Sequence, residues 1–106
     1  LALLNDEAML EMASGLADRV LEEGGGSTRD QLIHAFRLCL TRRPTEAELE
    51  RLMAFHQQQE AHYRAHPEMA ARLLRGESTK TPASLRAAWT LVTNVLLNLD
   101  EALTKQ

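Results

Sequence analysis

Apolar residues recur at helical spacing along the chain, in five segments separated by glycine, proline or short polar stretches. The first segment follows Asn5, a residue type that often caps a helix N-terminus, and stops at three consecutive glycines, residues 24–26. Its apolar face consists of Met9, Met12, Ala13, Leu16 and Val20. We therefore predict an amphipathic helix, followed by a loop or hinge.

The second and third segments are separated only by a short turn at Pro44, which predicts two helices packed as neighbours. Ser27 or Thr28 is expected to cap the first of these helices, while Thr45 and Glu48 form a capping box that opens the other. The apolar arc of the second segment consists of Leu32, Ile33, Phe36, Cys39 and Leu40. Cys39 is therefore expected to be a small buried apolar residue rather than a reactive thiol.

The apolar stripe of the third segment fades along its length. It consists of Leu49, Leu52, Met53, His56 and Tyr63. After Phe55 the chain becomes mostly polar, with three glutamines and a glutamate at residues 57–60. We therefore expect the far half of this helix to project into solvent or against a partner.

The last two segments differ in length and in polarity. Pro67 fits the first position of a short fourth helix, whose apolar residues are Met69, Leu73 and Leu74. A polar loop at residues 76–80 leads to Thr81 and Pro82, which are expected to open the last helix. We expect this helix to end near Asn98 in a left-handed turn, leaving residues 100–103 as a short tail.

The last helix carries the broadest apolar arc in the sequence. Its members are Leu85, Ala88, Trp89, Val92, Val95, Leu96 and Leu99. Such a wide arc is typical of a helix that packs against several others. No segment alternates between β-branched and polar residues, as a half-buried strand would. The sequence therefore predicts an all-α fold, a compact bundle of about five helices with the apolar C-terminal helix at its centre.

The length and composition fit one domain spanning residues 1–106. With 44% hydrophobic and 25% charged residues, the chain can build an ordinary core without a metal or a disulfide. The single cysteine, Cys39, rules out an intrachain disulfide and a c-type haem attachment motif. The first residue is Leu1 rather than Met, which suggests a processed product or a piece of a longer polypeptide.

The charge balance argues against nucleic acid as a partner. Twelve basic residues against fifteen acidic ones give a net charge of -3, and phosphate binding needs clustered cations. The second and third helices suggest a helix-turn-helix, but the presumed recognition helix would bring Glu46, Glu48 and Glu50 towards phosphates. No stretch approaches the length of a membrane span.

The histidines are the strongest candidates for chemistry. His62 and His66 lie four residues apart, so one helical face presents both imidazoles, a ligand type that suits zinc, copper or iron. A complete site would need Glu60, Glu68 or residues from another chain, since His56 lies too far along the helix. Unliganded histidines are the simpler interpretation, and the sequence predicts no bound metal or cofactor.

His56 lies in the middle of the apolar stripe, where a neutral, buried ring is common. No nucleophile or orienting carboxylate is identifiable beside it, so acid–base catalysis has no support in the sequence. We predict no catalytic residues and a protein that is not an enzyme.

Four segments together resemble a known family. They are Leu1-Ala2-Leu3-Leu4-Asn5-Asp6, Ala35-Phe36-Arg37-Leu38, the turn from Thr41 to Leu49, and the stretch from Ala88-Trp89 to Asp100-Glu101. Their order resembles the C-terminal helical part of the PSD-type domain of unknown function found in large planctomycete proteins. The resemblance implies an exported, multidomain protein, often with a cytochrome-c-like module, and it implies no catalytic residue.

Two functional hypotheses follow. The first is a noncatalytic helical structural or protein-interaction module that packs against the rest of a parent polypeptide or against another protein. The alternative is a metal-binding or enzyme-accessory domain that uses His62 and His66. Periplasmic or exported localisation is implied by the resemblance alone.

Overall fold

The computed structural model describes residues 7–76 and 80–104, with side chains described up to residue 99. These residues form five α-helices and no strand, as the sequence predicts. The helices are α1 (Glu7–Glu23), α2 (Thr28–Leu40), α3 (Glu46–Ala65), α4 (Pro67–Leu73) and α5 (Ala83–Thr104). The radius of gyration, 13.0 Å, is that of a compact domain of this length.

Local signals in the sequence set most helix ends. The Ser27 hydroxyl accepts a hydrogen bond from the backbone N–H of Asp30 at the start of α2. At the start of α3, the capping box forms as predicted, because Thr45 and Glu48 each accept a bond from the backbone N–H of the other. Pro67 takes the first turn of α4. Helix α5 begins at Ala83, one residue after Pro82.

The connection between α1 and α2 depends on glycine. A Cβ at Gly24 would lie 2.6 Å from the carbonyl oxygen of Val20 and 3.0 Å from the Cα of Gln31. Gly25 adopts a φ of +96°, which residues with a Cβ rarely do. The chain can therefore turn tightly from α1 into α2 only because both positions lack a side chain.

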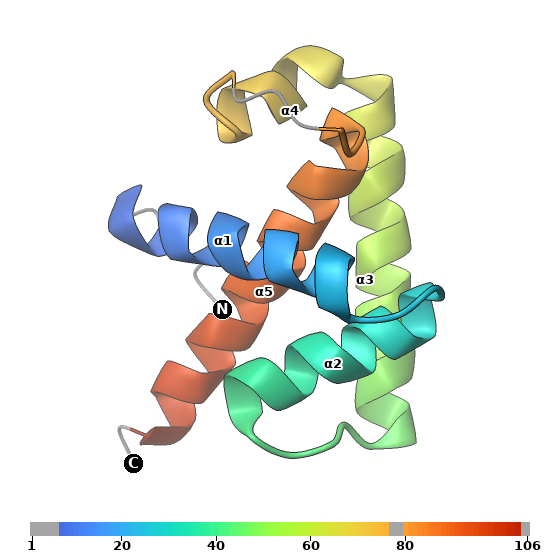
Figure 1. Cartoon of the computed structure of the whole chain (residues 1–106), viewed down its shortest axis with the longest axis vertical. Helices are drawn as coiled ribbons and strands as arrows, with labels where there is room; N and C mark the ends of the chain where they lie inside the picture. The colour runs from blue at the N-terminus through green and yellow to red at the C-terminus, as the bar shows by residue number, and fades with distance from the viewer. Residues whose placement is uncertain (1–6, 77–79, 105–106) are drawn as a thin grey trace.

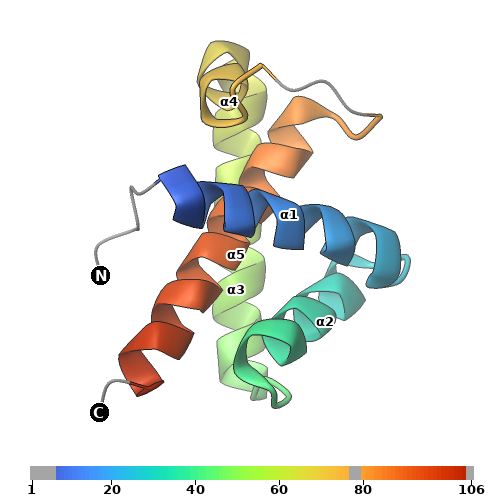
Figure 2. The same ribbon diagram turned by 60° about the vertical axis from the view of Figure 1, so that its left-hand side comes forward.

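Helix α5 is the centre of the bundle, as predicted, and contacts all four other helices. Figure 1 shows α1 crossing in front of α5, α3 running alongside it, α4 at one end and α2 at the other. Trp89, Val92 and Leu96 are fully buried in the main core, together with Phe36 of α2 and Leu49 of α3. The view in Figure 2 confirms that α1 lies across α5 rather than parallel to it.

The predictions about two helix surfaces need correction. Most side chains in the far half of α3 are exposed, as expected, but Tyr63 packs with Ala70, Leu74 and Ala87 in a second, smaller core cluster between α3, α4 and α5. The side chains of α4 and α5 supply the apolar partners that the polar stretch of α3 lacks. Met12 is also 51% exposed, and Ala17 takes its place in the core.

The predicted end of α5 is also wrong. Asn98 lies inside the helix, and its amide donates hydrogen bonds to the backbone oxygen and the Oδ1 of Asn94, one turn earlier. Residues 99–104 contain neither glycine nor proline, so nothing stops the helix at Asn98. In α4, Met69 is 40% exposed and Ala70 is buried in its place, while Leu74 is buried as expected.

Candidate functional site

A buried polar seam joins α1 to the first half of α5. The Arg86 side chain is only 4% exposed, and its Nε donates to the Asp18 Oδ1 at 2.8 Å. Its Nη2 donates to the Asp18 Oδ2 at 3.0 Å and to the Ser14 hydroxyl at 2.9 Å. Ser14 and Asp18 are one turn apart on α1, so a single guanidinium reaches both. Paired, charge-assisted bonds of this kind fix orientation as well as adding stability.

The seam continues along α5 through buried hydroxyls. The Thr93 hydroxyl lies 2.7 Å from the carbonyl oxygen of Ala13 on α1, and the Thr90 hydroxyl donates to the carbonyl oxygen of Arg86. Both threonines are buried. These polar residues were missed by the sequence analysis, which placed only apolar residues of α5 in the core. Their spacing at 86, 90 and 93 is helical, and that spacing was the available signal.

A pocket of about 340 Å³ opens beside the seam, between α1, the end of α4 and α5. Its walls combine Leu10 and Leu73 with the charged residues Glu11, Arg75 and Arg86. These charges are paired within the protein: Arg75 forms ion pairs with Glu7 and Glu11, and Arg86 with Asp18. The arrangement therefore suits holding α1 against α4 and α5 better than recruiting a charged ligand.

His56 lies in the core, 3% exposed, with its ring centroid 4.8 Å from that of Trp89. Burial lowers the pKa of His56 below its ordinary value, an effect that the nearby Glu60 carboxylate partly opposes. Among the described atoms, neither the His56 Nε2 nor the Trp89 Nε1 has a hydrogen-bond partner. The ring is therefore neutral near pH 7 and serves as an aromatic packing group.

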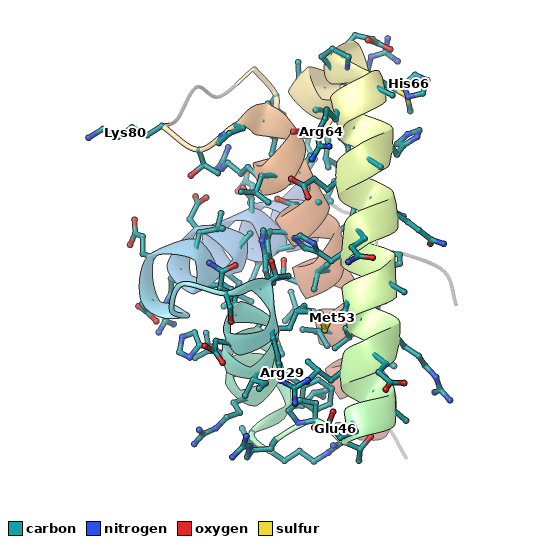
Figure 3. The ribbon with its side chains drawn as sticks, turned by 90° about the vertical axis from the view of Figure 1, so that its right-hand side faces the viewer. Arg29, Glu46, Met53, Arg64, His66 and Lys80 are labelled. Atoms are coloured by element: carbon teal, nitrogen blue, oxygen red, sulfur yellow. The ribbon has the colours of Figure 1, made fainter. Side chains whose placement is uncertain are left out.

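His62 and His66 lie together on the outer surface near the end of α3, where Figure 3 labels His66 and Arg64. Their ring centroids are 4.7 Å apart, and the His66 Nδ1 lies 3.0 Å from the carbonyl oxygen of His62. The proposed helper Glu60 forms an ion pair with Arg64 at 3.1 Å. In the described part of the chain, no group of three or more His, Cys, Asp or Glu side chains is arranged to hold a metal.

An open apolar groove lies between the first half of α3 and the second half of α5, with α2 beneath it. We call it the α3–α5 groove, and it is lined by Phe36, Glu48, Arg51, Leu52, Phe55, Val95 and Leu99. Its volume is about 600 Å³, larger than that of the pocket beside the seam. Figures 1 and 2 show α3 and α5, the helices that form its walls, diverging towards the start of α3 and the end of α5.

The floor and the walls of the α3–α5 groove differ in exposure. Phe36 and Leu52 are buried and form its floor. Phe55 and Val95 are only partly buried, and Leu99 is 36% exposed. The sequence placed Val95 and Leu99 in the apolar arc of α5, but it did not predict that they would face an open groove. Clustered apolar exposure of this kind is typical of interaction sites.

One end of the α3–α5 groove is bounded by charge. Arg42 donates two hydrogen bonds of 2.9 Å to the Glu48 carboxylate, and its guanidinium lies 4.8 Å from the Phe36 ring centroid. These bonds, helped by the backbone N–H of Thr45, lower the pKa of Glu48 to about 2. Cys39, on the same face of α2 as Phe36, is buried as predicted, so its thiol takes no part in this surface.

Comparison with known proteins gives one match. Residues 1–56 match the model of a family described as PSD1, protein of unknown function (DUF1553). This range covers α1, α2 and the first half of α3, including the α3 residues of the α3–α5 groove. Neither the curated proteins nor the solved structures include a match to this chain. Among the described residues, no helix is long and apolar enough to cross a membrane.

Proposed function

We propose that this chain, which belongs to the PSD1 family of proteins of unknown function (DUF1553), is a noncatalytic helical module that docks onto another protein segment through the α3–α5 groove. The observation that carries this proposal is the cluster of Phe55, Val95 and Leu99 around an open apolar floor. Burying these side chains against a partner would remove apolar surface from water, which is the main favourable term in most protein association.

The rest of the molecule supports an interaction module over an enzyme. The ionised side chains of the pocket beside the seam are paired with one another, and His56 is packed against Trp89 in the core. Neither arrangement places a nucleophile, a base and an open substrate position together, as acid–base or nucleophilic catalysis requires. In the α3–α5 groove, by contrast, Phe55, Val95 and Leu99 leave apolar surface exposed.

We also propose that the module is the C-terminal part of a larger, exported polypeptide, and that the docking partner belongs either to that polypeptide or to another protein. The support is the resemblance to large planctomycete proteins that carry cytochrome-c-like modules. In this arrangement the bundle supplies a rigid surface, and any redox or catalytic chemistry belongs to other parts of the assembly.

The experiment that tests docking is hydroxyl-radical footprinting of the isolated chain and of the natural full-length polypeptide that contains it. We expect Phe55 and Leu99 to be labelled in the isolated chain and protected in the full-length protein or its native complex. Met12 and Met69, which are 51% and 40% exposed and lie outside the groove, serve as internal controls. Equal labelling of Phe55 and Leu99 in both forms would contradict the proposal.

A metal-binding role for His62 and His66 remains the second candidate. The contact between the His66 Nδ1 and the His62 carbonyl oxygen supports it, because a hydrogen bond to one ring nitrogen orients a histidine, as it does in many metal-ligating histidines. Zinc and copper titration by calorimetry compares the natural chain with the double variant His62→Ala, His66→Ala. Stoichiometric binding that the double variant loses would support this role, and identical titrations would exclude it.

A further inference from the structure

We propose that the partner segment is an amphipathic helix with an acidic flank, and that one of its carboxylates pairs with Arg51. This inference rests on the proposed docking function and specifies the chemistry of the partner. It follows from the shape of the α3–α5 groove and from the charges on its rim.

The shape of the groove suits a helix. Its α3 wall presents Glu48, Arg51, Leu52 and Phe55, spaced one and two turns apart, and its α5 wall presents Val95 and Leu99, one turn apart. Ridges with this spacing accept the side-chain rows of a third helix laid between them. A helix-in-groove contact uses apolar anchors at about every turn, and Leu52, Phe55, Val95 and Leu99 offer apolar surface at that spacing.

Among the described residues that line the groove, Arg51 carries the unpaired charge, because the acidic side chain of Glu48 is already paired. Glu48 lies three residues before Arg51, a spacing at which residues on a helix surface are neighbours. Glu48 is instead held by two bonds from Arg42 and by the backbone N–H of Thr45. Among the described residues, no acidic side chain forms an ion pair with Arg51, which is exposed beside the apolar floor.

Arg51 therefore sets the sign of the charge that suits a partner at this rim. Complementary charges on a docking surface steer the encounter and suppress partners of the wrong sign. A helix whose apolar face is bordered by glutamate or aspartate therefore matches both features of the groove, whereas a lysine-bordered helix meets repulsion at Arg51.

The test uses a display library of designed helices about 15 residues long, roughly four turns. Each helix carries leucines at i, i+4 and i+7, and its flanking positions vary among Glu, Gln and Lys. The library is selected on the chain and counter-selected on the variant Leu99→Asp, whose fold is checked by circular dichroism. We expect the enriched helices to carry Glu on one flank.

Charge reversal then identifies the contact. The enriched helices should bind Arg51→Glu about tenfold more weakly than the natural chain, because attraction becomes repulsion, and the Lys-flanked versions should prefer the variant. Arg72→Glu is the matched control, since Arg72 is an exposed arginine on α4 outside the α3–α5 groove, and it should leave affinity unchanged.

The outcomes distinguish failure of the acidic, helical partner from failure of the proposed docking function. Equal enrichment of Gln, Lys and Glu flanks, with binding lost in Leu99→Asp but not in Arg51→Glu, would overturn the acidic partner and leave docking intact. If no helix is enriched, the proposal of a helical partner is overturned. It is also overturned if a second copy of the chain occupies the groove, which would be detected as concentration-dependent self-association. Footprinting in the full-length polypeptide would still decide whether the groove docks at all.

Discussion

The two halves of α5 differ in the polarity and in the exposure of the side that faces a neighbouring helix. In the first half, the side facing α1 is polar but closed, with Arg86 bound to Asp18 and Ser14 and with Thr93 bound to the Ala13 carbonyl. In the second half, the side facing α3 is apolar but open, with Val95 and Leu99 lining the α3–α5 groove. The contacts of the polar half are completed within the chain, and we propose that another surface completes those of the apolar half.

This difference shows that buried polar side chains do not by themselves mark a functional site in this protein. A buried arginine and buried threonines would ordinarily attract attention as a site, yet each named contact of the seam joins α1 to α5 or closes a turn of α5. Two apolar residues that the sequence pattern assigns to the core, Val95 and Leu99, instead line an open groove. The predictions below test this division, from the largest expected effect to the smallest.

The core shared by both halves should give the largest effect. Trp89 is fully buried and contacts the ring of His56, so Trp89→Ala removes a large apolar side chain from the centre of the bundle. We expect the free energy of unfolding to fall by about 3–5 kcal/mol, measured by urea denaturation followed by circular dichroism. A change within experimental error would show that α5 is not the central helix.

The closed half should respond strongly to loss of a single carboxylate. Asp18→Ala removes the carboxylate that accepts two bonds from the buried Arg86 guanidinium, so we expect a loss of about 2 kcal/mol, the scale of a hydrogen bond to a charged group. Glu22→Ala is the control, because Glu22 is an exposed acidic residue one turn further along α1. Equal effects of the two substitutions on thermal unfolding would mean that the seam does not hold α1 in place.

Sequence reasoning succeeded where the signal is local. The capping box of Thr45 and Glu48, Pro67 at the start of α4 and the glycines after α1 act within one turn of chain, and the structure agrees with each. It failed where burial depends on a distant helix. Arg86 and Thr93 are buried because α1 crosses α5, a contact between residues about 70 to 80 positions apart.

The same limit explains the groove. Val95 and Leu99 have the helical spacing of core residues, and the apolar arc of α5 is correct as a pattern. Their exposure depends on how α3 and α5 pack in the bundle, which neither segment determines by itself. The far half of α3 shows the reverse case, since Tyr63 is buried only because α4 and α5 pack against it.

The start of α3, beside the groove, should show a moderate effect. Thr45→Ala removes the acceptor for the Glu48 backbone N–H and should cost about 1 kcal/mol, as other helix caps do. In the natural chain the pKa of Glu48 is about 2 against an ordinary 4.5, so its stabilising contribution is complete above pH 4.5 and is lost as the pH falls towards 2. Glu48→Gln should lack this part of the acid dependence in pH-dependent denaturation.

His56 should contribute a smaller pH dependence of the same sign. Its pKa is lowered in the folded state by burial, so the unfolded chain binds a proton first as the pH falls below about 6.5. Stability should therefore decrease as the pH falls from 6.5 towards the lowered pKa. His56→Phe should remove this slope. His34→Phe is the control, because it makes the same substitution at a partly exposed histidine that is paired with Glu23. An unchanged slope in His56→Phe would show that the buried ring is not its source.

The most direct test of the division within α5 is to measure one substitution in two contexts. Leu99→Ser should change the free energy of unfolding of the isolated chain by no more than about 0.5 kcal/mol, because this side chain is already 36% exposed. In the natural full-length polypeptide or its complex, the same substitution should destabilise the domain by about 2 kcal/mol, measured by hydrogen exchange of α5. An equal change in both contexts would contradict the account, because the open half of α5 would then have no partner to complete it.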